Sequence, residues 1–104
     1  MVDMKRFEND INGVSSYWND LMPTMTCEEC GELIQALSKY LRVKKMHTMS
    51  EPTSVSATTI NKAIFNITDE IGDLYISLGA IQKYLGISDE AVYGRIEYKL
   101  NKKY

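Results

Sequence analysis

Two segments of the sequence carry pairs of acidic residues at helical spacing. Glu29 and Glu32 form one pair and Glu70 and Asp73 the other, each within the pattern Glu-x-Gly-acid-Leu. Three residues turn through about 300° on an α-helix, so both acids of a pair project from the same face. Like charges at this spacing weaken a helix unless a cation lies between them. Because Mg²⁺ prefers a few carboxylates together with substrate phosphates, the repeat predicts a magnesium site, with Mn²⁺ as the alternative ion.

Structural interpretations of the first segment are also open. Glu29 has the spacing to close a capping box with Thr26, although this leaves the second pair unexplained. Cys27 and Cys30 form a CxxC motif, which in a cytosolic chain is either redox-active or zinc-binding. A zinc site would lack partners because His47 is the single histidine, and both cysteines fall on an apolar stripe where free cysteine is readily buried. We therefore expect buried, structural cysteines and a solvated histidine in a loop.

Apolar residues recur at three- and four-residue steps in four segments, which is typical of amphipathic helices. The pattern predicts helices over 4–18, about 25–44, 60–85 and from 89 onward. Thr24 or Thr26 is the N-cap candidate of the second helix, Gly86 suits the C′ position of the third, and Ser88 suits the N-cap of the last. The serine- and threonine-rich stretch 47–58 has no apolar period and predicts a loop.

These elements predict an all-α fold. No strand-like alternation of useful length appears, and helices with mostly short connections favour a four-helix bundle. A chain of 104 residues is long enough for one modest core and too short for two, so we treat 1–104 as a single domain. Phe65 and Ile76 fall away from the main stripe of the third helix, which makes that helix apolar on two faces. A central or subunit-bridging position follows.

Composition excludes several classes of partner. Twelve Lys and Arg against 14 Asp and Glu give a net charge of -2, with no basic excess for nucleic acid. Charges or glycines interrupt every apolar stretch, so no 20-residue membrane span is expected. The first ten residues carry charges where a signal peptide needs an apolar run, and we expect a cytoplasmic protein.

The two acidic motifs resemble the signature of the MazG-like all-α nucleoside triphosphate pyrophosphatases, an ExxE on one helix and an ExxD on a later one. Glu29-x-x-Glu32 and Glu70-x-x-Asp73 match it, and the likeness extends over about Met25 to Leu100. The resemblance implies magnesium-dependent hydrolysis between the α and β phosphates, with the four acids as metal ligands. Glu29 would also be catalytic, and Glu28 would hold a second ion or orient the attacking water. Members of the family are usually dimers or dimers of dimers.

Six residues are candidate substrate contacts: Trp18, Arg42, Lys45, Lys99, Asn101 and Lys103. The family contacts phosphates through a basic, asparagine-containing stretch near the end of the last helix, and the three C-terminal candidates are similar to it in composition. It recognises the base with the amino-terminal helix, which makes Trp18 a candidate stacking platform, although core packing is the other interpretation. Arg42 and Lys45 lie beside the predicted loop, where they either contact phosphate or form a solvated helix end.

Two functions of different classes remain. The first is a magnesium-dependent nucleoside triphosphate pyrophosphohydrolase, and the presence of all four acids favours it. The alternative is a non-catalytic helical oligomer that uses the acids for metal-dependent assembly or nucleotide sensing. A di-iron carboxylate bundle would need Glu-x-x-His pairs, which the sequence lacks.

Overall fold

The computed structural model describes residues 3–49 and 54–103, and every regular element within these ranges is helical. The elements are α1 (Met4–Trp18), a short 3-10 helix η1 (Asn19–Leu21), α2 (Met22–Met49), α3 (Ser54–Leu85) and α4 (Asp89–Lys103). The all-α class and the bounds of α1 are therefore as predicted. None of the helices in the described part of the chain has the length and apolar character needed to cross a membrane.

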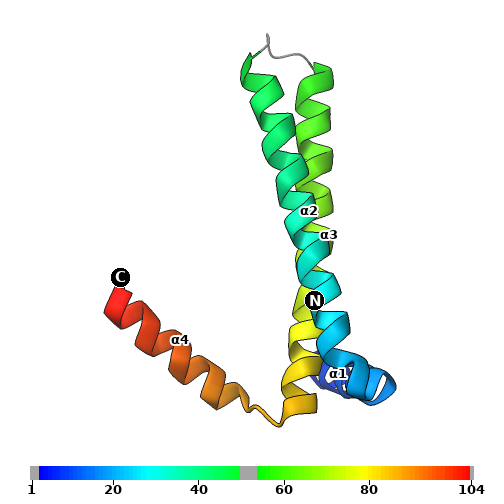
Figure 1. Ribbon diagram of the computed structural model, residues 1–104, viewed down its shortest axis with the longest axis vertical. Helices are drawn as coiled ribbons and strands as arrows, with labels where there is room; N and C mark the ends of the chain where they lie inside the picture. The colour runs from blue at the N-terminus through cyan, green and yellow to red at the C-terminus, as the bar shows by residue number, and fades with distance from the viewer. Residues whose placement is uncertain (1–2, 50–53, 104) are drawn as a thin grey trace.

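Helices α2 and α3 lie side by side as a long antiparallel hairpin (Figure 1). The residues that meet in the seam between them alternate at steps of three and four, which is the spacing of a coiled coil. On α2 they are Met22, Thr26, Glu29, Leu33, Ala36, Tyr40, Val43 and His47, and on α3 they are Ile60, Ala63, Ile67, Glu70, Leu74, Ser77, Ile81 and Tyr84. All of them are buried or half-buried. Most are apolar, and Thr26 and Ser77 hydrogen-bond to each other. The two glutamates are the acidic members of the set, and a buried acid needs an explanation.

One hydrogen bond between the two helices reports their register. The Ser77 hydroxyl donates to the Thr26 hydroxyl oxygen at 3.1 Å. Because antiparallel helices advance equally in opposite directions from such a contact, Leu33 lies at the level of Glu70, and Glu29 at the level of Leu74. The two seam glutamates therefore occupy adjacent levels of the hairpin, on opposite helices.

Helix α1 packs across the end of the hairpin that is remote from the α2–α3 connection (Figure 1). Its buried residue Ile11 forms the core with Met22 and Ala80, and Phe7, Val14, Trp18, Met25, Ile81 and Tyr84 pack around them. A Cβ at Gly79 would lie 3.2 Å from Ile11 Cγ2, so the glycine permits the close approach of α1 to α3. The Tyr84 hydroxyl donates to Asp20 at 3.0 Å and ties η1 to α3.

The start of α2 differs from the prediction. The helix begins at Met22, so Thr24 and Thr26 lie inside it and the N-cap assignment was wrong. Pro23 lies in the first turn of α2, where a missing backbone N–H loses no intrahelical hydrogen bond, so the helix runs through it.

The predicted loop 47–58 is also too long. Helix α2 continues to Met49 and α3 begins at Ser54, so parts of both helices lie within that range. His47 lies in the last turn of α2, half-buried in the seam, and not in a solvated loop. Packing across the hairpin stabilises helical turns whose serines and threonines have only modest intrinsic propensity. Residues 50–53 lie outside the described ranges.

The end of α3 and the start of α4 agree with the sequence. Gly86 has φ of 69°, and Ile87 N donates to Gln82 O at 2.9 Å in the double hydrogen-bonding pattern of a Schellman motif. The Ser88 hydroxyl accepts from Ala91 N at 3.1 Å and caps α4. Beyond this turn, α4 runs away from the other helices (Figure 1). A four-helix bundle is therefore not confirmed among the described residues of one chain.

Candidate metal centre

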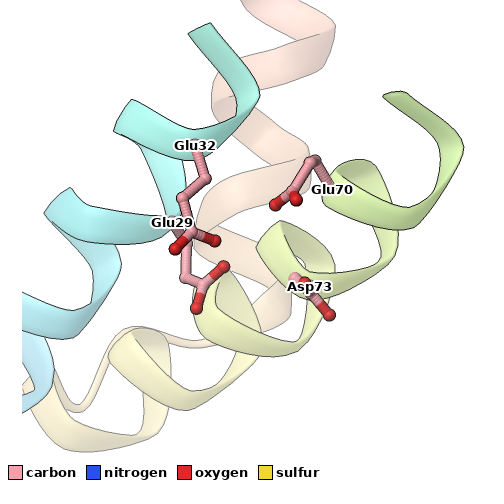
Figure 2. A group of neighbouring side chains, drawn as sticks. All are labelled: Glu29, Glu32, Glu70 and Asp73. Carbon is pink, nitrogen blue, oxygen red and sulfur yellow. The ribbon is translucent and has the colours of Figure 1, made fainter. Parts of the chain in front are cut away.

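The four acids of the two motifs meet at the seam of the hairpin. Glu29 and Glu32 come from α2, and Glu70 and Asp73 from α3 (Figure 2). Each residue offers one carboxylate oxygen, and these oxygens all lie within 4.8 Å of one another. The fold thus brings two sequence-distant pairs of acids into a single cluster of ligand size.

The seam repeat explains how the cluster is built. Glu29 and Glu70 occupy seam positions and are half-buried, whereas Glu32 and Asp73 each lie one residue before a seam leucine and are exposed. Leu33 and Leu74 occupy equivalent positions, a in the heptad notation, on their two helices. In an antiparallel pair of helices, the residues just before such positions lie on the same flank of the hairpin. The cluster is therefore set into the hairpin and opens to this flank.

The cluster is electrostatically unbalanced. Glu29 Oε2 and Glu70 Oε2 are buried and have no hydrogen-bond partner within 3–49 and 54–103. Burial raises the pKa of both carboxyls above the ordinary value, and repulsion from Glu32 and Asp73 raises it further. Unpaired buried charge is costly, and a bound cation would remove the cost. Four carboxylates in this arrangement fit the hard oxygen donor set that Mg²⁺ or Mn²⁺ prefers.

Without a divalent cation, the free energy of unfolding is expected to fall as pH rises above the ordinary carboxyl pKa. In that range the folded protein keeps protons on Glu29 and Glu70 that the unfolded chain has released, so deprotonation favours unfolding. Urea unfolding in EDTA at pH values between about 4 and 7 measures this. The double variant Glu29→Gln, Glu70→Gln should have a smaller fall than the wild type. If the free energy of unfolding fell equally with pH in the two proteins, the cluster would not be strained.

Two cavities flank the acids on the same hairpin. The first, of about 320 Å³, is mostly apolar and lies beside Glu29 and Asp73, towards α1. Trp18 packs against the core, as one of its two interpretations predicts, and it also lines this cavity. The Tyr17 ring meets the Trp18 ring edge-on, with centroids 5.1 Å apart.

The second cavity, which we call the polar cavity, has a volume of about 360 Å³ and lies on the other side of the acids, beside Glu32 and Glu70. Its remaining lining residues are Gln35, Ala36, Lys39, Ala63, Asn66 and Asp69. Sequence reasoning missed its three potential hydrogen-bond donors, which are Gln35, Lys39 and Asn66. Lys39 follows Glu32 by one heptad on the same flank of α2, a spacing that becomes informative only after the seam is known.

The other predicted site residues are not brought to the acids within one chain. Glu28 is exposed on α2 and is not part of the four-residue cluster, although it lies one turn before Glu32. Arg42 and Lys45 are exposed further along α2, Arg42 at about 15 Å beyond Glu32 by helical rise. Lys99 and Asn101 are exposed on α4, which lies apart, and the side chain of Lys103 is outside the described part of the structure.

The cysteines of the motif region differ from expectation, and its glycines lie in open space. Cys27 and Cys30 are free and exposed in the single chain, so their predicted burial was wrong for one copy. They lie on the part of the α2 stripe that the hairpin does not cover. A Cβ at Gly31 or Gly72 would meet no atom within 4 Å, so neither glycine serves a close backbone approach within one chain. Gly72 lines a wider cavity of about 590 Å³ between α1 and α3, where it leaves room.

No family model, curated protein or solved structure gives a significant match to the chain. The likeness to MazG-like enzymes therefore consists of the two acidic motifs and their surroundings. What these residues can do follows from their placement. They form a carboxylate cluster of ligand size, with two unpartnered buried oxygens, between an apolar cavity and a polar one.

Proposed function

We propose that the protein is a magnesium-dependent nucleoside triphosphate pyrophosphohydrolase. The observation that supports this most strongly is the convergence of four carboxylates with two unpartnered buried oxygens at the α2–α3 seam. Seam positions in a helical hairpin are normally apolar, so two glutamates placed there lower stability and need a compensating ligand. The acidic motifs also resemble those of the MazG-like pyrophosphatases, whose reaction requires such a cluster.

The reaction assigns a role to each acid. Glu29, Glu32, Glu70 and Asp73 would hold the ion, and Mn²⁺ would replace Mg²⁺ there. An ion held by these four acids would neutralise charge that develops on the phosphate oxygens and would make water a better nucleophile. Water adds to the α-phosphorus and the bond from that atom to the α–β bridging oxygen breaks, giving a nucleoside monophosphate and pyrophosphate.

The acids of α2 are also the candidates for handling the attacking water. Glu28 lies on the flank to which the cluster opens, one turn before Glu32, where it can orient the water. Glu29 lies in the same cluster, one turn of helix from Glu32, and is the second candidate to accept the proton. The proton of the water would pass to one of these two carboxylates and from there to solvent.

The apolar cavity is the proposed place for the nucleobase. It adjoins Glu29 and Asp73, and Trp18 supplies a ring on its wall. Stacking of a base on an aromatic side chain contributes roughly 1–3 kcal/mol and tolerates any base. The expected substrate class is therefore nucleoside triphosphates, without a preference among bases.

A panel of ribo- and deoxynucleoside triphosphates tests the function. Pyrophosphate and monophosphate are expected in equal amounts, with Mg²⁺ required and EDTA abolishing both. Release of orthophosphate alone would contradict attack at the α-phosphorus. Saturable nucleotide binding with no product would instead support the non-catalytic sensor, and neither binding nor turnover would overturn both functions.

We also propose that two copies of the chain associate through the hairpin. On the flank opposite the acids, α2 and α3 expose large apolar side chains along their length, which we call the apolar flank: Ile34, Leu37, Leu41, Ile64, Ile71 and Leu78. Ile34 and Leu41 are 63% and 65% exposed in one chain. Continuous apolar surface of this kind marks an interface, and two hairpins packed with twofold symmetry would form a four-helix bundle. The acids would stay accessible on the outside.

Leu37→Glu is expected to dissociate this assembly, because it places a charge in the middle of the apolar flank. Sedimentation velocity should give a mass of at least twice 11.9 kDa for the wild type and of one chain for the variant. Gln35→Glu, which adds the same charge to the opposite side of α2, is the matched control and should keep the wild-type mass. A monomeric wild type at about 100 µM, or an associated Leu37→Glu protein, would refute the proposed interface.

A further inference from the structure

The polar cavity has chemistry that the four acids do not explain. The glutamates Glu32 and Glu70 form one end of it, and Lys39 lies towards the other. Two adjacent levels of the seam carry Ala36 and Ala63, whose small side chains leave space beside them. The cavity is therefore a recess with acids at one end, Lys39 and Asn66 towards the other, and Gln35 between them.

The helix geometry directs Lys39 into this recess. It follows Glu32 by seven residues on the same flank of α2, a rise of about 10 Å. Side chains of a helix lean towards its amino terminus, so the Lys39 stem leans back towards Glu32. Asn66 leans the opposite way along the antiparallel α3, towards the level of Lys39. The ammonium and the amide thus approach the same part of the cavity from facing helices.

Lys39 has no ion pair in the described part of the chain, although acids line the same cavity. Arg42 and Lys45, the nearby cations chosen from the sequence, line none of the cavities that adjoin the acids. A ligand that used both ends of the recess would need oxygens for a cation held by the acids and further negative charge for the ammonium. A diphosphate has both.

We propose that the polar cavity binds the β and γ phosphates of the substrate, and hence the leaving pyrophosphate. Lys39 donates to their non-bridging oxygens, and the side-chain amides of Gln35 and Asn66 donate alongside it. This inference rests on the proposed function, which sets how the substrate lies across the acids. The base is in the apolar cavity and the terminal phosphates are in the polar one. Negative charge grows on pyrophosphate as it departs, and Lys39 is the cation nearest to the acids in this recess.

Isothermal titration with inorganic pyrophosphate in the presence of Mg²⁺ tests the subsite without turnover. Lys39→Met should bind pyrophosphate about 10- to 100-fold more weakly than the wild type, because it removes a charge-assisted hydrogen bond. Lys39→Arg should restore most of the affinity. Lys62→Met, which removes an equal charge from an exposed position on α3 that does not line the cavity, is the control and should bind within about twofold of the wild type.

The outcomes separate the subsite from the proposed function. Pyrophosphate binding that depends on Lys39 in a protein that hydrolyses no nucleotide would keep the subsite and overturn the enzyme. Nucleotide hydrolysis with equal pyrophosphate affinity in Lys39→Met and Lys62→Met would keep the enzyme and overturn the subsite. Failure of the wild type to bind pyrophosphate with Mg²⁺ would also overturn the subsite. Where hydrolysis occurs, Lys39→Met should lower kcat/KM by a similar factor, with an unchanged melting temperature.

Discussion

Replacing Glu32 by glutamine is expected to lower the rate of pyrophosphate release by about 100- to 1,000-fold, the loss typical when one group that stabilises transition-state charge is removed. The amide keeps the size of the side chain and removes its charge. Glu32 is exposed, and its charge is among the causes that raise the pKa of both Glu29 and Glu70. The substitution should therefore spare the fold and relieve repulsion within the cluster. Asp73→Asn is expected to behave in the same way.

Initial rates of pyrophosphate release at saturating Mg²⁺ measure this effect, and circular dichroism confirms that the variants are folded. Glu97→Gln, an equal change at an exposed acid on α4, should retain the wild-type rate. A Glu32→Gln or Asp73→Asn protein that turns over like the wild type would remove that residue from the mechanism. An equal loss in Glu97→Gln would show that net charge, and not the cluster, controls the rate.

Mg²⁺ is expected to raise the melting temperature of the wild type. An ion that binds only the folded state stabilises it by about 2.7 kcal/mol at one hundred times its Kd. For a domain of this size, that corresponds to a rise of roughly 10 °C or more. The size of the effect follows from the cluster, because the ion both gains ligands and cancels repulsion among four acids.

The double variant Glu29→Gln, Glu70→Gln separates the site from general salt effects. It should melt above the wild type in EDTA, since two strained charges are gone, and should respond little to Mg²⁺. Differential scanning calorimetry at equal protein concentration and ionic strength compares the two proteins. An equal Mg²⁺ shift in both would place the ion elsewhere, and a variant less stable than the wild type in EDTA would contradict the strain assigned to the seam glutamates.

The features that sequence reasoning predicted well depend on local spacing. The acid pairs share a helix face because of the helical repeat, and Gly86 and Ser88 end and start helices through contacts with near neighbours. Helix bounds that depend on tertiary packing were less accurate. The turn around His47 remains helical with that side chain half-buried in the seam, which its own residues do not indicate, and Pro23 is tolerated because it lies in the first turn of α2.

Features that depend on the pairing of helices could not be predicted. The register reported by Thr26 and Ser77 places the two acid pairs at adjacent levels, and neither residue suggests that pairing by itself. The polar cavity depends on Ala36 and Ala63, which lie at adjacent levels of the seam only in this register, so Lys39 was overlooked in favour of Arg42 and Lys45. The separation of α4 from the hairpin likewise follows from the turn geometry at Gly86 and not from the apolar pattern of α4.

The most direct test of the metal centre is the anomalous diffraction of crystals grown with Mn²⁺. The cluster predicts an anomalous peak between α2 and α3, with carboxylate oxygens of Glu29, Glu32, Glu70 and Asp73 at about 2.0–2.3 Å from it or joined to it through one water. A crystal structure in which the hairpin is ordered and Mn²⁺ is bound elsewhere would contradict a divalent cation site at the seam. The absence of bound Mn²⁺ would also contradict it, when the crystals contain enough Mn²⁺ to saturate any shift in melting temperature.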